Sequence, residues 1–348
     1  MNLEERKIAF IQLGKVLENF VEKKEWSDFS CGLTKEEFDS FNHIILKSKI
    51  HNGWFTEDNV RNSIAGIVSM LREVELESWL EKYLVIDANK KVGVIMAGNI
   101  PMVGFHDMLC VLISGNVLLA KPSSEDNLLL PAVANLLKTI EPRFESRIHF
   151  VPKLNKFDAV IATGSDNSAR YFESYFGKYS NLIRKNRTSI AVINGNETEK
   201  ELSNFALDVF LYFGKGCRNV TKVLLPSGYN LDNLFKAFYP FKEIVNHNKY
   251  ANNYDYNKAV YMMNKVELIE NGFLLMKEDE SLHSPLAVLN YHYYKTEEEL
   301  KNYLDTHDSQ IQCVVGSDYI PFGKAQFPEV NDYADGEDTM KFLLSLNA

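Results

Sequence analysis

The sequence predicts an α/β protein whose sheets are parallel, doubly wound and covered by helices on both faces. From Lys91 onward, short apolar runs that are typical of strands alternate with longer amphipathic runs that are typical of helices. The strand-like runs are almost continuously apolar, which indicates burial on both faces and therefore parallel pairing. Before Lys91 the apolar residues recur at helical spacing, so we expect helices ahead of the first strand.

The expected elements alternate along the first part of the chain. Strands are expected at residues 91–98, 116–121, 147–151, 158–164 and 189–195. Helices are expected at residues 60–84, 99–115, 125–140, 166–179 and 197–214. This order predicts a first α/β domain that follows an N-terminal helical region.

After Cys217 the alternation returns in a looser form and predicts a second α/β domain. Strands are expected at residues 221–226, 284–294 and 310–317, with helices at 231–250 and 296–307. No low-complexity linker marks the boundary, which we place after residue 208, so that the segments are 1–208 and 209–325. Residues 326–348 form a tail that ends in a short apolar helix and is expected to pack back on the body.

Composition excludes several classes of protein. The chain has 348 residues, enough for two domains, and its net charge of −9 argues against a nucleic-acid binder. Its four cysteines include no CxxC pair, so we expect neither a disulfide framework nor a metal site. A charged N-terminus and the lack of an apolar run of about 20 residues argue against a signal peptide and an integral membrane protein. We expect a soluble, cytoplasmic protein.

The stretch YFGKGCRNVTK, residues 212–222, places a thiol between glycines and cations. A phosphate-binding glycine loop is one interpretation, because GKGCRN begins like the GxGxxG pattern. However, Asn219 stands where the third glycine belongs. The stretch also follows a predicted helix and precedes a predicted strand, which is the reverse of the order in dinucleotide-binding motifs. This interpretation is therefore rejected.

Two interpretations of Cys217 remain open on the residues alone. A lone cysteine is most often a small buried apolar residue. Here Lys215 and Arg218 lie within two positions, and nearby cations favour the nucleophilic thiolate. Gly214 and Gly216 permit unusual backbone geometry and close approach of a substrate. No partner motif of a cysteine protease accompanies the thiol.

Six short motifs recur in a fixed order along the chain. They are AGNIP (97–101), SGNVLLAKPSSED (114–126), ATGS (162–165), FGKGCRNVTKVLLP (213–226), SPLAVL (284–289) and PFG (321–323). Together they resemble the ordered landmarks of the aldehyde dehydrogenase superfamily. GKGCRN, FGKAQFPEVNDYADGEDTM and the short length are most similar to its acyl-CoA reductase branch, the LuxC type. The resemblance covers about two-thirds of the chain, from about Lys91 onward.

The resemblance implies an aldehyde-dehydrogenase-like fold, with a Rossmann-like cofactor domain within 1–208 and a catalytic thiol domain at 209–325. It assigns Cys217 as the nucleophile that takes up the acyl group as a thioester. It assigns Asn99 as the amide donor that forms the oxyanion hole together with the backbone N–H of Cys217. Such a donor can be worth about 3–4 kcal/mol in the transition state. Independently of the resemblance, Asn99 also suits a turn before a proline.

The resemblance places the cofactor at the end of the second strand. Lys121 would hold the adenosine ribose, at a strand end where doubly wound sheets bind ligands. NAD-preferring relatives often carry a glutamate three positions after this lysine, whereas this chain has Ser124 there and Glu125 one later. With Ser123 and Ser124 as donors, the pattern favours NADPH.

Gly164 and Ser165 match the helix start that lies near the cofactor pyrophosphate in the superfamily. A helix N-terminus favours phosphate, and a serine there can also be an ordinary N-cap. Both functions are compatible, so we assign the two residues to the cofactor site.

One departure from the superfamily bears on the reaction. Hydrolytic aldehyde dehydrogenases carry a glutamate that activates water, and here Ile183 within NLIRKNRTS stands near that position. The pattern therefore implies an NADPH-dependent acyl-CoA reductase, acting on fatty acyl-CoA as the family does. A CoA-independent aldehyde dehydrogenase for a small aldehyde and an inactive scaffold are the alternatives. The oligomeric state stays open, with a homodimer as one option, and a partner enzyme that supplies the acyl group or uses the aldehyde fits the family.

Overall fold

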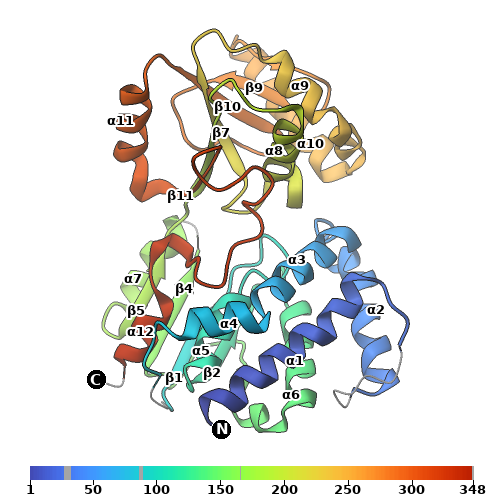
Figure 1. The fold of residues 1–348 in the computed structure, drawn as a ribbon, viewed down its shortest axis with the longest axis vertical. Coiled ribbons are helices and arrows are strands. Elements are labelled where there is room, and N and C mark those ends of the chain that lie inside the picture. Colours follow the sequence, from blue (N-terminus) through green and yellow to red (C-terminus); the bar gives the residue numbers. More distant parts are fainter. Residues whose placement is uncertain (27–32, 86–88, 165, 347–348) are drawn as a thin grey trace. The chain divides into compact units, whose positions relative to one another are not determined.

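A computed structural model describes residues 1–26, 33–85, 89–164 and 166–346 (Figure 1). The chain divides into two compact units. The first unit comprises Met1–Asn186 and Pro328–Ala348, and the second comprises Arg187–Phe327. Within the described ranges, none of the helices combines the length and apolar character needed to cross a membrane.

The first unit is built on a five-stranded parallel sheet in the order β3-β2-β1-β4-β5. Its strands are β1 (Lys91–Ile95), β2 (Val117–Lys121), β3 (Ile148–Phe150), β4 (Ala159–Thr163) and β5 (Ser180–Arg184). The chain adds β2 and β3 on one side of β1 and then β4 and β5 on the other. The point where this direction reverses, between β1 and β4, is where open α/β sheets bind ligands, at the carboxyl ends of the strands.

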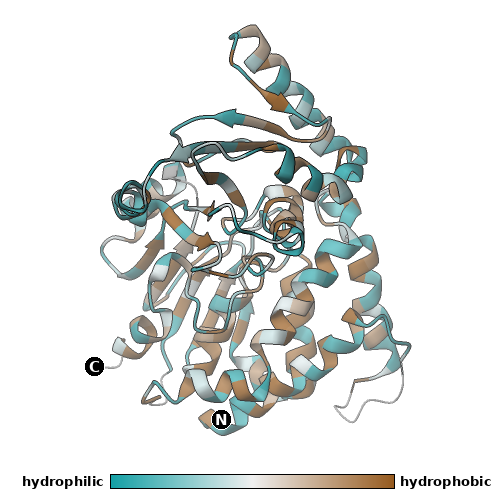
Figure 2. Ribbon diagram, turned by 45° about the horizontal axis from the view of Figure 1, so that its top comes forward, coloured by the Kyte–Doolittle hydropathy of each residue, from teal (hydrophilic) through white to brown (hydrophobic). Residues whose placement is uncertain are grey.

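Helices cover the sheet of the first unit. They are α1 (Leu3–Val21), α2 (Lys35–His51), α3 (Glu57–Met70), α4 (Glu73–Leu80), α5 (Phe105–Ile113), α6 (Leu129–Ile140), α7 (Asp166–Phe176) and α12 (Thr339–Ser345). Helix α5 is buried at almost every position, and α1 and α2 pack against α6. In Figure 2 the covering helices alternate between hydrophobic and hydrophilic stretches, as expected for helices with one buried face.

The single helix expected at 60–84 is two helices. Leu71 ends α3, and Arg72 takes an extended conformation before α4 begins. The break coincides with close packing between helices, because a Cβ at Gly14 of α1 would lie 2.9 Å from the Leu71 Cβ. Tertiary contact therefore overrides the helical periodicity of this segment.

The second unit contains a six-stranded sheet in the order β11-β6-β7-β10-β9-β8. Its strands are β6 (Thr188–Val192), β7 (Val220–Pro226), β8 (Ile269–Glu270), β9 (Leu275–Glu278), β10 (Val288–Tyr294) and β11 (Ile311–Val315). All neighbours pair in parallel except β8 and β9, which are antiparallel. These two sheets confirm the predicted α/β fold.

Two apolar clusters lie on the sheet of the second unit. One cluster packs α8 (Glu199–Phe210) and α9 (Asp232–Phe238) against the strands. The other packs α11 (Glu297–His307) against β6 and β7. Helix α10 (Asn248–Met263) completes the unit.

The units divide earlier than the predicted boundary at residue 208. The reason is β6, which was expected to close the first domain but pairs with β7 and β11, so Ala191 lies opposite Val223. The tail from Pro328 clusters with the first unit, where α12 packs on α5. Arg184 connects these elements, since it binds both carboxylate oxygens of Asp107 and the hydroxyl of Thr339.

Candidate active site

Cys217 lies in a tight loop between the 3-10 turn Leu211–Gly214 and the amino end of β7. Three consecutive residues before it have left-handed backbone, with φ of 54° at Tyr212, 58° at Phe213 and 77° at Gly214. Only glycine adopts this conformation without cost, so the two aromatic residues store strain. Local strain of this kind persists only where the surrounding structure fixes it, and it is frequent at functional sites.

Asn219 fixes the loop from within. Its side chain is fully buried, and its amide nitrogen donates to the carbonyls of Asp208 at 3.1 Å, Val209 at 3.3 Å and Leu211 at 2.9 Å. Its amide oxygen accepts from the N–H of Gly216 at 2.8 Å. One carboxamide therefore satisfies the open carbonyls at the end of α8 and holds the residue that precedes Cys217.

Asp208 connects the loop to the FGKA segment near the end of the second unit. Its buried carboxylate accepts from the N–H groups of Gly323 at 2.6 Å and Ala325 at 2.9 Å. Burial raises the pKa of Asp208 to about 6, while these two hydrogen bonds act in the opposite direction. Arg218 donates from Nε to the carbonyl of Ala325, which makes a second connection to the same segment.

Cys217 is the accessible thiol among the three described cysteines. It is half-buried, whereas Cys110 and Cys313 are buried, and burial raises the pKa of the Cys110 thiol well above its usual range. The carbonyl of Cys217 accepts a 3.0 Å hydrogen bond from the hydroxyl of Ser189 on β6. The main chain at the thiol is therefore held while its side chain is half-buried.

Asn99 lies in the first unit, in the loop that follows β1, and is half-buried. The same loop contains Met102, whose backbone is left-handed with φ of 55°. The N–H of Met102 donates to Asp126 Oδ2 at 2.7 Å, and that of Leu129 donates to Oδ1 at 3.3 Å. Asp126 is buried, and burial raises its pKa to about 6. This carboxylate joins the Asn99 loop to the start of α6.

Three residues predicted to bind the cofactor lie at the end of β2 or in the turn after it. Lys121 and Ser123 are half-buried and Ser124 is exposed. The turn touches the Asn99 loop, because a Cβ at Gly98 would lie 2.6 Å from the Ser123 Cβ. A glycine is therefore required where the two loops meet.

Gly164 follows β4, the strand on the other side of β1. A Cβ there would lie 2.8 Å from the Ser168 Cβ and 2.9 Å from the Phe172 ring, so glycine permits close contact with α7. Ser165 lies outside the described residues. In the first unit, Lys121 ends β2, and Asn99 and Gly164 follow the neighbouring parallel strands β1 and β4, so all three lie toward the carboxyl ends of the strands. Cys217 belongs to the second unit.

Ile183, near the position of the missing glutamate, is in β5 at the side of the first sheet. The strand reads SNLIR and contains no carboxylate. Its one buried charge is Arg184, which pairs with Asp107 at 2.8 Å.

Four residues that contact these loops or lie in them were not predicted from the sequence: Asn52, Asp126, Asp208 and Asn219. From the sequence, Asn219 was noted only because it replaces the third glycine of a GxGxxG pattern. Asp208 left a signal, since it interrupts the apolar run FALDVF of the predicted helix 197–214. Asp126 is the last residue of the motif SGNVLLAKPSSED, and no function was predicted for it. Asn52, which contacts the turn after β2, lies outside every motif.

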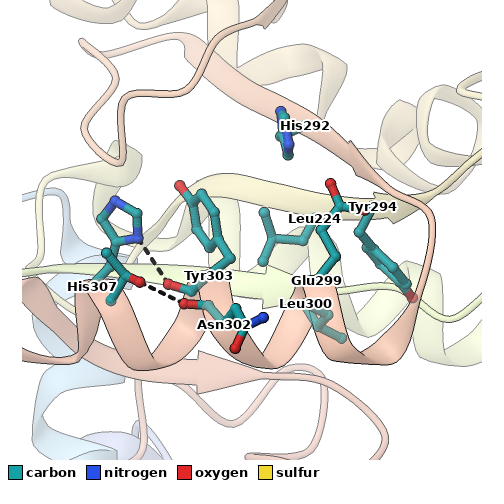
Figure 3. Close-up of a pocket in the computed structure, with 9 residues that line it drawn as sticks. Leu224, His292, Tyr294, Glu299, Leu300, Asn302, Tyr303 and His307 are labelled. Carbon is teal, nitrogen blue, oxygen red and sulfur yellow. Dashed lines mark hydrogen bonds between the residues drawn. The ribbon is translucent and has the colours of Figure 1, made fainter.

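A separate hollow of about 260 Å³ lies in the second unit between α11 and the strands β7 and β10 (Figure 3). Three rings lie in sequence along it: the Tyr303 ring centroid is 6.0 Å from that of His292 and 4.3 Å from that of His307. Its floor includes Leu224, in the carboxyl half of β7, whereas Cys217 precedes the amino end of that strand. The hollow is therefore distinct from the thiol loop.

Comparison with known structures identifies the fold. Aldehyde dehydrogenase 21 from Physcomitrella patens, in complex with the product succinate, matches with a TM-score of 0.66 at 12% identity, over 99% of this chain and 84% of that chain. An NAD+ complex of aldehyde dehydrogenase from Bacillus cereus matches with a TM-score of 0.61 at 12% identity, over 91% and 72%. The aldehyde dehydrogenase KauB from Pseudomonas aeruginosa matches with a TM-score of 0.62 at 12% identity, over 91% and 72%. The chain has the aldehyde dehydrogenase fold.

Comparison with protein families identifies the branch. No curated protein matches the chain significantly. The model of the acyl-CoA reductase (LuxC) family matches residues 34–234, which is more than half of the chain. This match includes the loops of Asn99, Lys121 and Cys217. The chain therefore belongs to the acyl-CoA reductase (LuxC) family, and its family and fold support an aldehyde-related oxidoreductase.

Proposed function

We propose that the protein is an NADPH-dependent acyl-CoA reductase that converts an acyl-CoA, with a long fatty chain, to the aldehyde and CoA through a thioester on Cys217. The observation that carries this proposal is the Cys217 loop. It combines the accessible thiol of the described chain with a strained backbone that Asn219 and Ser189 hold in place. A fixed and accessible nucleophile is what covalent catalysis requires.

In the proposed reaction the Cys217 thiolate attacks the thioester carbon of the acyl-CoA, and the CoA thiolate leaves and takes up a proton. The acyl group is then held as a thioester on the enzyme. Bound NADPH supplies the hydride that reduces this acyl group. The Asn99 amide and the Cys217 N–H are proposed to stabilise the oxyanion. Collapse of the thiohemiacetal releases the aldehyde and restores the Cys217 thiolate.

The first unit offers a site that fits a nicotinamide cofactor. Lys121 ends β2, Ser123 and Ser124 follow it, and Gly164 follows β4, at the carboxyl ends of the strands, where ligands bind in this fold. One structural neighbour is an NAD+ complex, which supports the same class of cofactor here. A serine in place of a carboxylate at position 124 favours the 2′-phosphate of NADPH.

The choice of CoA over water as the acyl partner rests on a missing base. Strand β5, which contains Ile183, has no carboxylate that could activate water. A thioester on Cys217 should therefore hydrolyse slowly and persist until hydride transfer.

The test is NADPH oxidation by the purified protein with a long-chain acyl-CoA, with NADH and a short-chain acyl-CoA in parallel. We expect turnover that needs the CoA thioester and an acyl adduct, seen by intact-protein mass spectrometry, when the cofactor is omitted. Cys217→Ser should abolish both signals, whereas Cys110→Ala, which changes a buried cysteine on α5 of the first unit, should retain them. Oxidation of a small aldehyde without CoA would instead favour an aldehyde dehydrogenase, and neither activity would favour an inactive scaffold.

A further inference from the structure

Asn52, at the end of α2, contacts the turn that follows β2. Its amide nitrogen lies 3.2 Å from the carbonyl oxygen of Glu125 and 3.1 Å from Glu125 Oε2. One donor therefore reaches the main chain and the side chain of the same residue. This requires the Glu125 carboxylate to fold back toward its own carbonyl.

The orientation of Asn52 is itself fixed. The residue is 4% exposed, and its amide oxygen accepts from the N–H of Trp54 at 3.1 Å. With the oxygen committed to Trp54, the amide nitrogen must point toward Glu125. The tether is thus built into the fold of the N-terminal helices, although Glu125 itself is exposed.

The turn that Asn52 contacts is the one where cofactor preference is decided in sheets of this type. An acidic side chain near the end of the second strand binds the ribose 2′-hydroxyl of NAD, and a 2′-phosphate requires that negative charge to be absent. Glu125 is the carboxylate nearest in sequence to Ser124, and Asn52 holds it back.

We propose that Asn52 determines cofactor preference, because it ties the Glu125 carboxylate back and leaves Lys121, Ser123 and Ser124 to receive a 2′-phosphate. The inference rests on the proposed function, since it assumes that NADPH binds at the end of β2. Without the tether, Glu125 can turn toward the ribose. There it repels a 2′-phosphate and accepts a hydrogen bond from a free 2′-hydroxyl.

The experiment measures the dissociation constants of NADPH and NADH by the fluorescence of the reduced nicotinamide, without turnover. The proteins are wild type, Asn52→Ser, Glu125→Gln and the double variant. A serine at position 52 keeps an oxygen that can accept from Trp54 but is too short to hold the Glu125 carboxylate. We expect Asn52→Ser to weaken NADPH binding about five- to tenfold, the effect of one like-charge contact at a partly exposed site, and not to weaken NADH binding.

The double variant shows whether the charge of Glu125, or a general disturbance of the fold, causes the change in nucleotide binding. If the freed carboxylate causes the change, Asn52→Ser/Glu125→Gln should bind both nucleotides as Glu125→Gln does. An equal loss of both nucleotides in Asn52→Ser, or a loss that persists in the double variant, would mean a merely structural role and overturn the inference. An unchanged NADPH-to-NADH ratio in Asn52→Ser would also overturn it, with the proposed function intact. Failure of wild type to bind either nucleotide would overturn both.

Discussion

Asn219 lies two residues after the proposed nucleophile, and its carboxamide joins the loop to the end of α8. Asn219→Ala would leave three carbonyls and one N–H without this partner, and each buried group left unpaired costs roughly 1–3 kcal/mol. We expect the free energy of unfolding to fall by about 3 kcal/mol and kcat to fall at least tenfold, with a smaller change in KM for the acyl-CoA. Urea unfolding and steady-state kinetics measure these effects.

The reactivity of the Cys217 thiol distinguishes an effect of Asn219 on the position of Cys217 from an effect on stability alone. The rate at which iodoacetamide alkylates Cys217 should change in Asn219→Ala under conditions where the variant is fully folded. Asn252→Ala, an exposed asparagine on α10, is the matched control and should behave as wild type. Wild-type alkylation and an unchanged kcat in Asn219→Ala would contradict the positioning function.

Asp208 should make stability depend on pH in a distinctive direction. Burial raises its pKa to about 6 from the ordinary value of 3.8, so between these values the folded protein binds more protons than the unfolded chain. The contribution of Asp208 is therefore greatest below pH 4 and is lost as the pH rises through 6, by up to about 3 kcal/mol. We expect the difference in unfolding free energy between wild type and Asp208→Asn to decrease from pH 4.5 to 7.5. Parallel curves in urea unfolding would argue against this prediction.

The sequence offers candidates for the reacting groups, which stay predictions, but it gave little sign of the buried polar residues that hold the candidate loops. Cys217, Asn99 and Lys121 lie in short motifs whose order is specific even though each motif is weak. Asp126 and Asp208 accept from main-chain N–H groups that are distant in sequence, and Asn219 binds main-chain groups of the turn that precedes it. A hydrogen bond from Gly323 to Asp208 depends on how the chain folds, and no spacing in the sequence encodes it.

At the scale of elements, the apolar runs predicted most strands of both sheets, because strands buried on two faces have few polar residues. Strand β5 was missed because it lies at one side of its sheet and has only five residues, of which Leu182 and Arg184 are buried. The single helix expected at 231–250 is α9, the 3-10 helix Tyr239–Asn246 and the first residues of α10. The rest of α10 was not predicted, because its apolar residues are spread around the helix. The hairpin of β8 and β9 is too short to give a periodic signal.

The pair of Arg184 and Asp107 connects three elements of the first unit, β5, α5 and α12. Both side chains are buried, and removing one partner of a buried ion pair leaves an uncompensated charge. We expect Asp107→Ala to lower the free energy of unfolding by about 3–5 kcal/mol. Replacing both residues with apolar ones, as in Asp107→Leu with Arg184→Met, should lower the free energy of unfolding by much less. Denaturant unfolding of the single and double variants tests this, and equal losses in both would contradict it.

At the scale of the whole molecule, the sequence predicted two α/β bodies but placed their boundary differently. In the predicted order the strand at 189–195 follows the helix at 166–179 in the same rhythm as the preceding elements, because β5 between them was not predicted, and so nothing local marked a change of sheet. Only its pairing with β7 and β11, which come later in the chain, assigns it to the second unit. Strand alternation can thus predict that sheets exist, but membership of a sheet is a long-range property.

The first unit combines two stretches, Met1–Asn186 and Pro328–Ala348, whereas the second unit is one continuous stretch, Arg187–Phe327. During synthesis the ribosome therefore releases all of the second unit before α12, which supplies the Thr339 contact of Arg184. Domains usually fold as units from the N-terminus onward. Here the later segment can complete its fold first, and the earlier one lacks α12 on the surface of α5 until that helix has been synthesised. A chain stopped before residue 328 would thus expose apolar surface on the nascent first unit and would be a natural client for chaperones.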